Sequence, residues 1–406
     1  MSSRHLAATL LALIGTVPAM APAMESTAKI TVAHESHEKR PAEVVAIPFA
    51  DVLRVLPDAR MYHLQVRDAG GNIIPSQITN YEHDHRGFRY DDLVFQYDLP
   101  ADSPAVFTLQ TIAATTAPIA PRVFARLVPE RYDDFAWEND RIAHRAYGPA
   151  LNTAGASVER LRGSGIDIWG KRVPFLVVDR WYLKGHDQFH KDGEGEGLDL
   201  YSIGGSRGAG GTGIWRNGKL FTSDNFASAR VLANGPLRAV FELTYAPWDI
   251  GDGQTVTETK RFTVEAGRNF DTMESVFTFA GSAELTVGLG ITQHKGTPLE
   301  VTRDARQQWL NTWETSADGG LGIAVILAPG TSAAGYASEP VGSAGSSYGN
   351  ELMLAKVRSG QPLKYWIGSG WDRSGQFATR AEWDRYVLGF VQRSQAPLQV
   401  KIEAVK

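Results

Sequence analysis

The sequence contains no cysteine among its 406 residues. Disulfide scaffolds, thiolate metal sites and catalysis by a cysteine thiol are therefore excluded. The fold must be stabilised by burial alone, which a chain of this length can provide. The length also favours two domains over one.

An excess of basic charge is absent as well. Lys and Arg number 41 against 45 Asp and Glu, which gives a formal net charge of -4, and both signs are interspersed along the chain. Proteins that bind nucleic acid or anionic membranes normally carry a basic patch. The composition therefore indicates no nucleic-acid partner and favours a small neutral or locally charged ligand.

Long apolar runs are absent after the first segment of the chain. Arg4 and His5 precede the apolar run from Leu6 to Ile14, and small residues follow, ending in Ala19-Met20-Ala21 or Ala21-Pro22-Ala23. This pattern predicts a secretory signal peptide over residues 1–23 and a periplasmic or secreted protein. The mature chain is expected to have no membrane span. Nothing in the sequence indicates an oligomeric state.

Helical periodicity is nearly absent, and short β-branched or aromatic runs between turn residues dominate, so we predict an all-β protein. Residues 24–117 are expected to form an N-terminal β-sandwich. Its strands are predicted at Ala42 to Phe49, Tyr62 to Arg67, Leu93 to Leu99 and Ala105 to Ile112. The stretch from Ala113 to Pro121, with Pro118 and Pro121, has no core-facing periodicity and is the predicted domain boundary.

Residues 122–406 are expected to form a large antiparallel two-sheet sandwich. Within Asp271 to Phe279, a period of two places Met273, Ser275 and Phe277 on one face, which indicates a strand with two different environments. One helix is predicted near the C-terminus. There Thr379 and Glu382 form a capping box, followed by Trp383, Tyr386, Val387 and Phe390 at helical spacing.

The densest polar segment runs from Lys184 to Tyr201 and is expected to be a loop that follows a strand at Val173 to Tyr182. The candidate catalytic residues there are His186, His190, Lys191, Glu194 and Tyr201, which together could supply a general base, a general acid and a charge clamp. The alternative is a solvated flexible loop. No cofactor and no metal site are assigned, although calcium on the carboxylates of this segment is an alternative.

A second polar segment lies at Glu130 to Tyr147. Either Arg141 or Arg145 could hold a sugar carboxylate through its planar guanidinium, and an internal salt-bridge network is the equal alternative for each. Further candidate substrate contacts are Glu138, Asp199, His294 and Trp371. A tryptophan ring can stack on sugar C–H faces, although core packing is its ordinary role.

Several blocks of this chain resemble a bacterial family that carries the label of a domain of unknown function. They are Trp137-Glu138-Asn139-Asp140, Arg145-Ala146-Tyr147-Gly148, His190-Lys191-Asp192-Gly193-Glu194-Gly195, Leu198-Asp199-Leu200-Tyr201 and Gly370-Trp371-Asp372-Arg373-Ser374-Gly375. The family is similar to the galactose-mutarotase-like supersandwich and is associated with uronate and plant-polysaccharide degradation. The resemblance therefore implies an N-terminal sandwich before a supersandwich, and it transfers no catalytic residues.

Three functions follow as hypotheses. The first is an exported enzyme on uronate-containing oligosaccharides or polysaccharides that cleaves by β-elimination. In that reaction an arginine neutralises the sugar carboxylate and a base among His186, His190, Lys191 and Tyr201 removes the C5 proton. The second is an aldose-1-epimerase-like mutarotase with Glu194 or Glu196 as base. The third is a glycan-binding protein without turnover.

Overall fold

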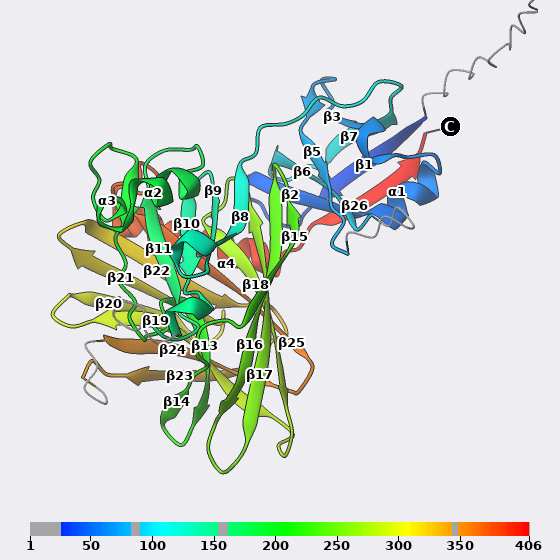
Figure 1. Ribbon diagram of the computed structural model, residues 1–406. Coiled ribbons are helices and arrows are strands. Elements are labelled where there is room, and N and C mark those ends of the chain that lie inside the picture. Colours follow the sequence, from blue (N-terminus) through cyan, green and yellow to red (C-terminus); the bar gives the residue numbers. More distant parts are fainter. Residues whose placement is uncertain (1–25, 83–89, 153–160, 343–347, 406) are drawn as a thin grey trace, which may run out of the picture.

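The computed structural model describes residues 26–82, 90–152, 161–342 and 348–405. The predicted signal peptide lies outside these residues. Within them, antiparallel strands dominate, as predicted. Figure 1 shows a smaller body formed by the N-terminal strands and the C-terminal strand, and a larger body formed by the strands between them. No helix in the described ranges has the length and apolar character needed to cross a bilayer.

The smaller body contains two sheets. Sheet A has the order β26 (Gln399–Ala404), β1 (Thr27–Ala33), β7 (Ala105–Thr111), β3 (Leu64–Arg67) and β4 (Ile73–Ile74). Sheet B has the order β2 (Arg40–Pro48), β6 (Asp92–Leu99) and β5 (Ser76–Ile78), and helix α1 (Phe49–Val55) follows β2. Residues 399–404 were expected in the C-terminal domain. In the structure, β26 pairs with β1 of the smaller body, from Ala28 opposite Ala404 to Ala33 opposite Gln399. The boundary at Pro118 and Pro121 stays a prediction.

The larger body contains three sheets. Sheet C has the order β12 (Gly197–Asp199), β11 (Ile166–Lys171), β10 (Ile142–Ala146), β9 (Asp134–Asn139) and β8 (Val123–Val128). Sheet D has the order β14 (Lys219–Phe221), β13 (Ala209–Arg216), β19 (Leu285–His294), β24 (Tyr348–Val357) and β23 (Ala333–Glu339). Sheet E has the order β15 (Ser228–Asn234), β16 (Arg238–Asp249), β17 (Thr255–Glu265), β18 (Phe270–Phe279), β25 (Pro362–Trp371), β22 (Gly319–Leu327), β21 (Trp309–Ser316) and β20 (Leu299–Asp304).

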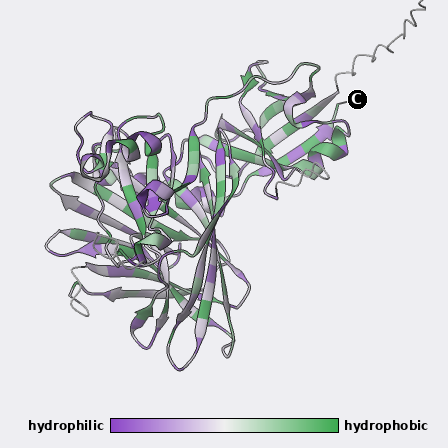
Figure 2. Ribbon diagram, in the orientation of Figure 1, coloured by the Kyte–Doolittle hydropathy of each residue, from purple (hydrophilic) through white to green (hydrophobic). Residues whose placement is uncertain are grey.

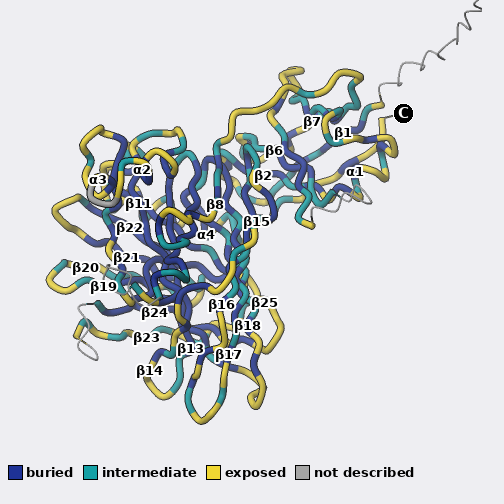
Figure 3. The backbone as a smooth tube through the Cα atoms, viewed as in Figure 1, coloured by how far each residue is buried: buried dark blue, intermediate teal, exposed yellow. Residues whose placement is uncertain are grey.

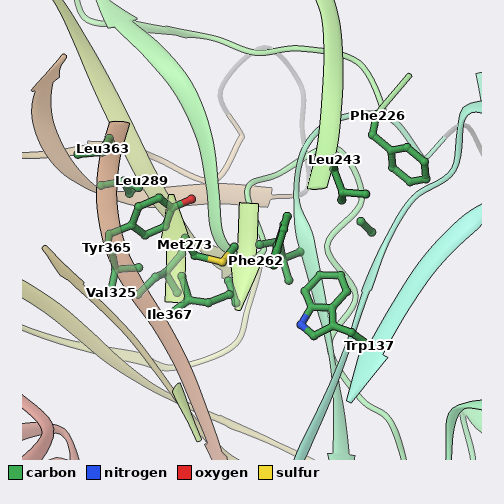
Figure 4. Packing of buried hydrophobic residues seen from close by; sticks show 14 of the residues in the cluster. Trp137, Phe226, Leu243, Phe262, Met273, Leu289, Val325, Leu363, Tyr365 and Ile367 are labelled. Carbon is green, nitrogen blue, oxygen red and sulfur yellow. The ribbon is translucent and has the colours of Figure 1, made fainter. Parts of the chain in front are cut away.

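The largest core lies between these three sheets. Figure 4 shows Trp137 from β9, Phe262 from β17 and Tyr365 from β25 converging in it. Each fully buried aromatic or aliphatic side chain of this kind contributes about 1.5–3 kcal/mol of transfer free energy. Hydrophobic and hydrophilic residues are interspersed along the strands (Figure 2), and the buried residues concentrate on the sheets (Figure 3). The predicted alternation in β18 is confirmed, since Met273 and Phe277 are fully buried.

The two bodies are joined by polar contacts. Arg268 of the larger body donates to Glu43 on β2 at 2.6 Å, and the amide of Gln96 on β6 donates to the backbone carbonyl of Ala266 at 2.5 Å. Both Glu43 and Gln96 belong to the short sheet B, which therefore faces the larger body. The bond between Arg268 and Glu43 is charge-assisted, and both bonds are directional, so they fix the orientation of one body on the other.

The structure contains more helix than the sequence predicted. The predicted strand at Val173 to Tyr182 is wrong, because its second half begins helix α2 (Val178–Lys184), and α3 (His186–Phe189) follows directly. The buried carboxylate of Glu138 accepts the backbone N–H groups of Val177 and Val178 at 2.8 and 2.7 Å. This stabilises the start of α2 from a strand about forty residues away, which local sequence does not reveal.

The predicted C-terminal helix is present as α4 (Arg380–Gln395). Its N-cap Thr379 accepts the N–H of Glu382, as the capping box requires. The indole of Trp383 is fully buried and lies directly on Gly322 and Gly370, where an added Cβ would come within 2.3 and 2.5 Å of the ring. The helix therefore packs against sheet E at two glycines on adjacent strands, where the absence of a Cβ leaves room for the indole.

Replacing Trp383 by Ala should destabilise the protein by about 3–5 kcal/mol, because it leaves a cavity and removes the bond from Nε1 to Asn311. The change is measured as a shift of the urea midpoint of the full chain. The matched control is Leu388→Ala on the same helix, which is 41% exposed and should change stability by about 0.5 kcal/mol or less. Equal shifts for both variants would contradict the docking role of Trp383.

Candidate functional site

Polar side chains gather on the outer face of sheet C, which is covered by α2 and α3. Strand register places Arg145 on β10 directly opposite Ala136 on β9 and Asp167 on β11. The neighbouring row places Trp169 opposite Asp199 on the edge strand β12. Because side chains on adjacent strands in register point to the same face, these groups meet beneath the two helices.

Arg145 is ion-paired inside this layer through Nε and Nη2, whereas its buried Nη1 has no hydrogen-bond partner among the described residues. Its Nε and Nη2 donate to Asp167 at 3.0 and 2.5 Å, and Nη2 also donates to Asp199 at 2.8 Å. Its guanidinium lies 5.6 Å from the centre of the Trp169 ring, and its side chain is 3% exposed. The expectation that Arg145 contacts a sugar carboxylate is therefore wrong, and so is that for Asp199, which is 2% exposed. Arg145 instead belongs to an internal salt-bridge network, which was the alternative expectation for this residue.

Glu138 is engaged in the same way. Besides the N–H groups at the start of α2, its carboxylate accepts from Nζ of Lys171 at 2.7 Å, and both side chains are fully buried. Removing a charged group from water costs several kcal/mol. Neither side chain could therefore stay buried and charged without the opposite charge of the other. Glu138 is consequently a structural residue and not the substrate contact that the sequence suggested.

The carboxylates in this layer have perturbed acidity. Burial raises the pKa of Asp134 to about 6, against the attraction of Arg145 and Arg131. Burial, together with repulsion from Asp199, raises the pKa of Asp167 to about 7. Three carboxylates thus share two guanidinium groups, and the cluster favours holding a proton near neutral pH.

His190 connects this cluster to the surface. It follows α3, its side chain is 40% exposed, and its Nδ1 lies 3.1 Å from the backbone oxygen of Asp199 and 3.7 Å from Oδ2 of the same residue. Its ring also contacts Phe189, which stacks on Trp169. A backbone carbonyl only accepts, so Nδ1 carries the hydrogen and Nε2 carries the lone pair when the ring is neutral.

Arg172 is connected to the segment that contains His190 through Asp192, and the sequence did not indicate it. It follows Lys171 at the end of β11 and pairs with Asp192 at 3.0 Å, two residues beyond His190. Its guanidinium also covers the face of Trp371, 5.1 Å from the ring centre, and its side chain is 35% exposed. No motif or spacing marks this arginine, since its partners come from distant segments.

Trp371 is not a saccharide platform. It is 3% exposed, its Nε1 donates to the carbonyl of Asp318 at 2.8 Å, and Arg172 covers its ring. Together with the partly exposed Arg141, it lines a small recess that also includes Asn269. Arg141 donates to Asn269 at 3.3 Å. Arg141 and Trp371 therefore lie on the same recess, and of the two only the arginine is partly exposed.

Tyr201 and His294 also meet, with ring centres 5.2 Å apart. Tyr201 is buried, and burial raises the pKa of its phenol well above the ordinary value, so it is unsuited to act as a base. The two ring nitrogens of His294 lie 2.7 Å from Glu314 and 2.5 Å from the carbonyl of Ser202. Burial disfavours the charged imidazole, but the hydrogen bond and charge of Glu314 outweigh it and raise the pKa of His294.

The remaining candidates of the polar segment differ in their accessibility. Lys191 is exposed. Glu194 is 60% exposed and pairs with Lys184 at 2.7 Å. Glu196 is nearly buried and accepts from Arg180 at 2.5 Å, so it is a poor base for a mutarotase. The backbone of His186 begins α3, and its side chain lies outside the described residues.

Among the described residues, no three His, Asp or Glu side chains come together as a metal site. The carboxylates of Asp192, Glu194 and Glu196 are each paired with a basic side chain instead. Calcium needs several oxygen ligands directed at one point. The arrangement of these residues therefore does not support the calcium alternative.

Comparison with known proteins identifies the family. The family model described as "Domain of unknown function (DUF4861)" matches residues 32–400. The chain belongs to the DUF4861 family. This confirms the expected membership of a family labelled as a domain of unknown function. "Uncharacterized protein P7" of Formosa agariphila is 32% identical over 384 residues, which covers 92% of this chain and 93% of that protein.

Two solved structures from Enterococcus faecalis resemble this DUF4861 chain. One is described as an alpha-mannosidase of strain V583, with a TM-score of 0.46, 10% identity, and coverage of 93% of this chain and 46% of that chain. The other is described as a protein in glycosyl hydrolase family 38, with a TM-score of 0.48, 11% identity, and coverage of 93% and 47%. The chain thus spans about half the length of both structures.

Because the pKa of Asp167 is raised in the folded protein, the free energy of unfolding should depend on pH. The unfolded chain releases this proton near the ordinary pKa of 3.8, whereas the folded protein holds it to about 7. The folded state then binds more protons between these values, so this contribution to stability is lost as pH rises through that window. Asp167→Asn cannot ionise. The free energy of unfolding of the wild type relative to the variant should therefore fall by about 1–4 kcal/mol from about pH 4 to about pH 7.

Urea unfolding of both proteins across this pH range measures the difference. Titrating groups that do not interact with Asp167 are shared, so their effects cancel in the comparison, and the remaining difference reports Asp167 together with its neighbour Asp199. A difference that is constant with pH, or that grows in favour of the wild type as pH rises, would contradict the raised pKa of Asp167.

Proposed function

We propose that this DUF4861 protein processes acidic carbohydrate at the rim formed by His190, Lys191 and Arg172, by β-elimination at a uronate. The observation that carries the proposal is the environment of His190. Its half-exposed ring rests on Asp199, which is held by the buried Arg145, and Arg145 is in turn paired with Asp167. A surface histidine anchored on a buried charge network has the fixed orientation that a general base requires.

Each group is assigned the role that its chemistry and its exposure allow. The lone pair on Nε2 of His190 would take the C5 proton of the uronate, and the proton would remain on the imidazole. Arg172 would bind the sugar carboxylate through its planar guanidinium in exchange for Asp192, which lowers the energy of the developing negative charge. The exposed ammonium group of Lys191 would protonate the departing glycosidic oxygen.

Turnover is tested with purified protein on polygalacturonate, alginate, glucuronan and rhamnogalacturonan, following the ultraviolet absorbance of the unsaturated product. His190→Ala should lower the rate by about 100-fold to 10,000-fold, since it removes the base. The matched control is His37→Ala, which removes a 92% exposed histidine of the smaller body and should leave the rate unchanged.

Three outcomes would refute the elimination reaction. They are the absence of product from all four polymers, full activity in His190→Ala, and equal losses in both histidine variants. Binding of a polymer without product would instead identify a glycan-binding protein, and anomeric exchange of free sugars seen by polarimetry would identify a mutarotase.

Export is part of the same proposal, because polymeric saccharides of this kind are met outside the cytoplasm. Cleavage after Ala21 or Ala23 should give a mature protein that begins at Pro22 or Met24. N-terminal sequencing of the protein recovered from the periplasm of a bacterial host measures this. Recovery only in the cytoplasm with Met1 retained would contradict export.

A further inference from the structure

A groove of about 840 Å³ lies between the two bodies, away from the His190 rim. Its walls are strands β3 and β4 of sheet A, strand β5 of sheet B, the connecting segment 116–119 and the turn between β15 and β16. This volume lies within the usual range for ligand pockets, about 300–1,000 Å³, and interfaces between domains are a common place for them.

The walls of the groove are fixed in place by hydrogen bonds. Oε1 of Gln77 on β5 accepts the N–H groups of Leu237 and Arg238 at 3.0 and 2.8 Å, so the turn after β15 is tied to the smaller body. The N–H of Thr116 donates to the carbonyl of Tyr62 at 2.8 Å, which ties the connecting segment to the same body. The groove is therefore preformed, and a ligand would not need to order it.

Charge is absent from the lining. Among the described residues that line the groove, none is Asp, Glu, Lys, Arg or His, although 21% of the chain is charged. A charged ligand would lose its hydration there without gaining a partner of opposite sign. The groove therefore selects against the acidic saccharides proposed for the His190 rim.

The lining combines exposed apolar faces with uncharged polar groups. Tyr62 is 61% exposed, Ile73 57% and Ile119 37%, which is unusual for three large side chains at one place. Oδ1 of Asn80 is buried and has no hydrogen-bond partner in the described structure, and Gln65 also lines the groove. A purely apolar ligand would cover the amides of Asn80 and Gln65 without giving them a hydrogen-bond partner, whereas hydroxyl groups of a ligand can donate to and accept from amides.

We propose that this groove binds a neutral oligosaccharide. Sugar rings present C–H faces, which suit the rings and side chains of Tyr62, Ile73 and Ile119, and hydroxyl groups, which suit the amides of Asn80 and Gln65. The groove would bind either the neutral portion of a mixed glycan or a separate neutral glycan. The uronate would be bound at the His190 rim. The binding site stands on its own lining and does not require the elimination reaction.

The test is isothermal titration calorimetry of the full chain with cellohexaose, xylohexaose, mannohexaose and laminarihexaose. At least one should bind, and Tyr62→Ala and Ile73→Lys should each weaken that binding about tenfold or more. The matched control is Val106→Lys, since Val106 is also an exposed β-branched residue of sheet A, 38% exposed, but lies outside the groove. It should bind as the wild type does.

The result is separable from the proposed enzymatic activity. His190→Ala should retain full affinity for the neutral hexasaccharide even if it abolishes turnover. Circular dichroism spectra should match the wild type for every variant, since Tyr62, Ile73 and Val106 are exposed. Absence of binding by all four sugars at millimolar concentration would overturn the proposal. Equal affinities of the Ile73→Lys and Val106→Lys variants, or saturable binding of an apolar peptide in place of sugar, would also overturn it.

Discussion

The buried guanidinium of Arg145 is the interaction on which the candidate site depends. It lies between sheet C and the α2–α3 segment, and it holds Asp167 on β11 and Asp199 on β12 at the same time. Burying this guanidinium without its two carboxylate partners would cost several kcal/mol of folding free energy. The folded protein therefore needs the register of β10 on β11, the edge strand β12 and the covering helices to be in place at the same time. The small side chain of Ala136, opposite Arg145 on β9, leaves room beside the guanidinium.

This constraint explains why His190, although half-exposed, has a fixed partner at the surface. Asp199 is fixed by Arg145, and it presents its backbone oxygen and carboxylate to the ring of His190. Glu194, by contrast, is paired with Lys184 at the surface, where an ion pair contributes little. A general base must be positioned more accurately than a surface charge, so the buried layer distinguishes His190 from the other candidates.

The contacts between the two bodies serve the second proposed site. Arg268 with Glu43 and the bonds of Gln77 to the turn after β15 fix the smaller body against the larger one. The proposed neutral-sugar groove is formed between these fixed surfaces, and the pairing of β26 with β1 returns the C-terminus to the smaller body. In a long glycan with neutral and acidic parts, the neutral part would suit the uncharged groove and the acidic part would suit the His190 rim.

The sequence by itself determined the all-β class, the strand alternation in β18 and the α4 helix with its cap, because each depends on residues close together in the chain. It also identified the polar segment that contains His190. Tertiary structure alone decided that α2 is a helix, since Glu138 stabilises its start from β9. It also decided that Arg145, Asp199, Tyr201 and Trp371 are buried and that Arg172 is exposed. Burial and charge pairing join residues far apart in sequence, and the composition of a segment does not specify its distant partner.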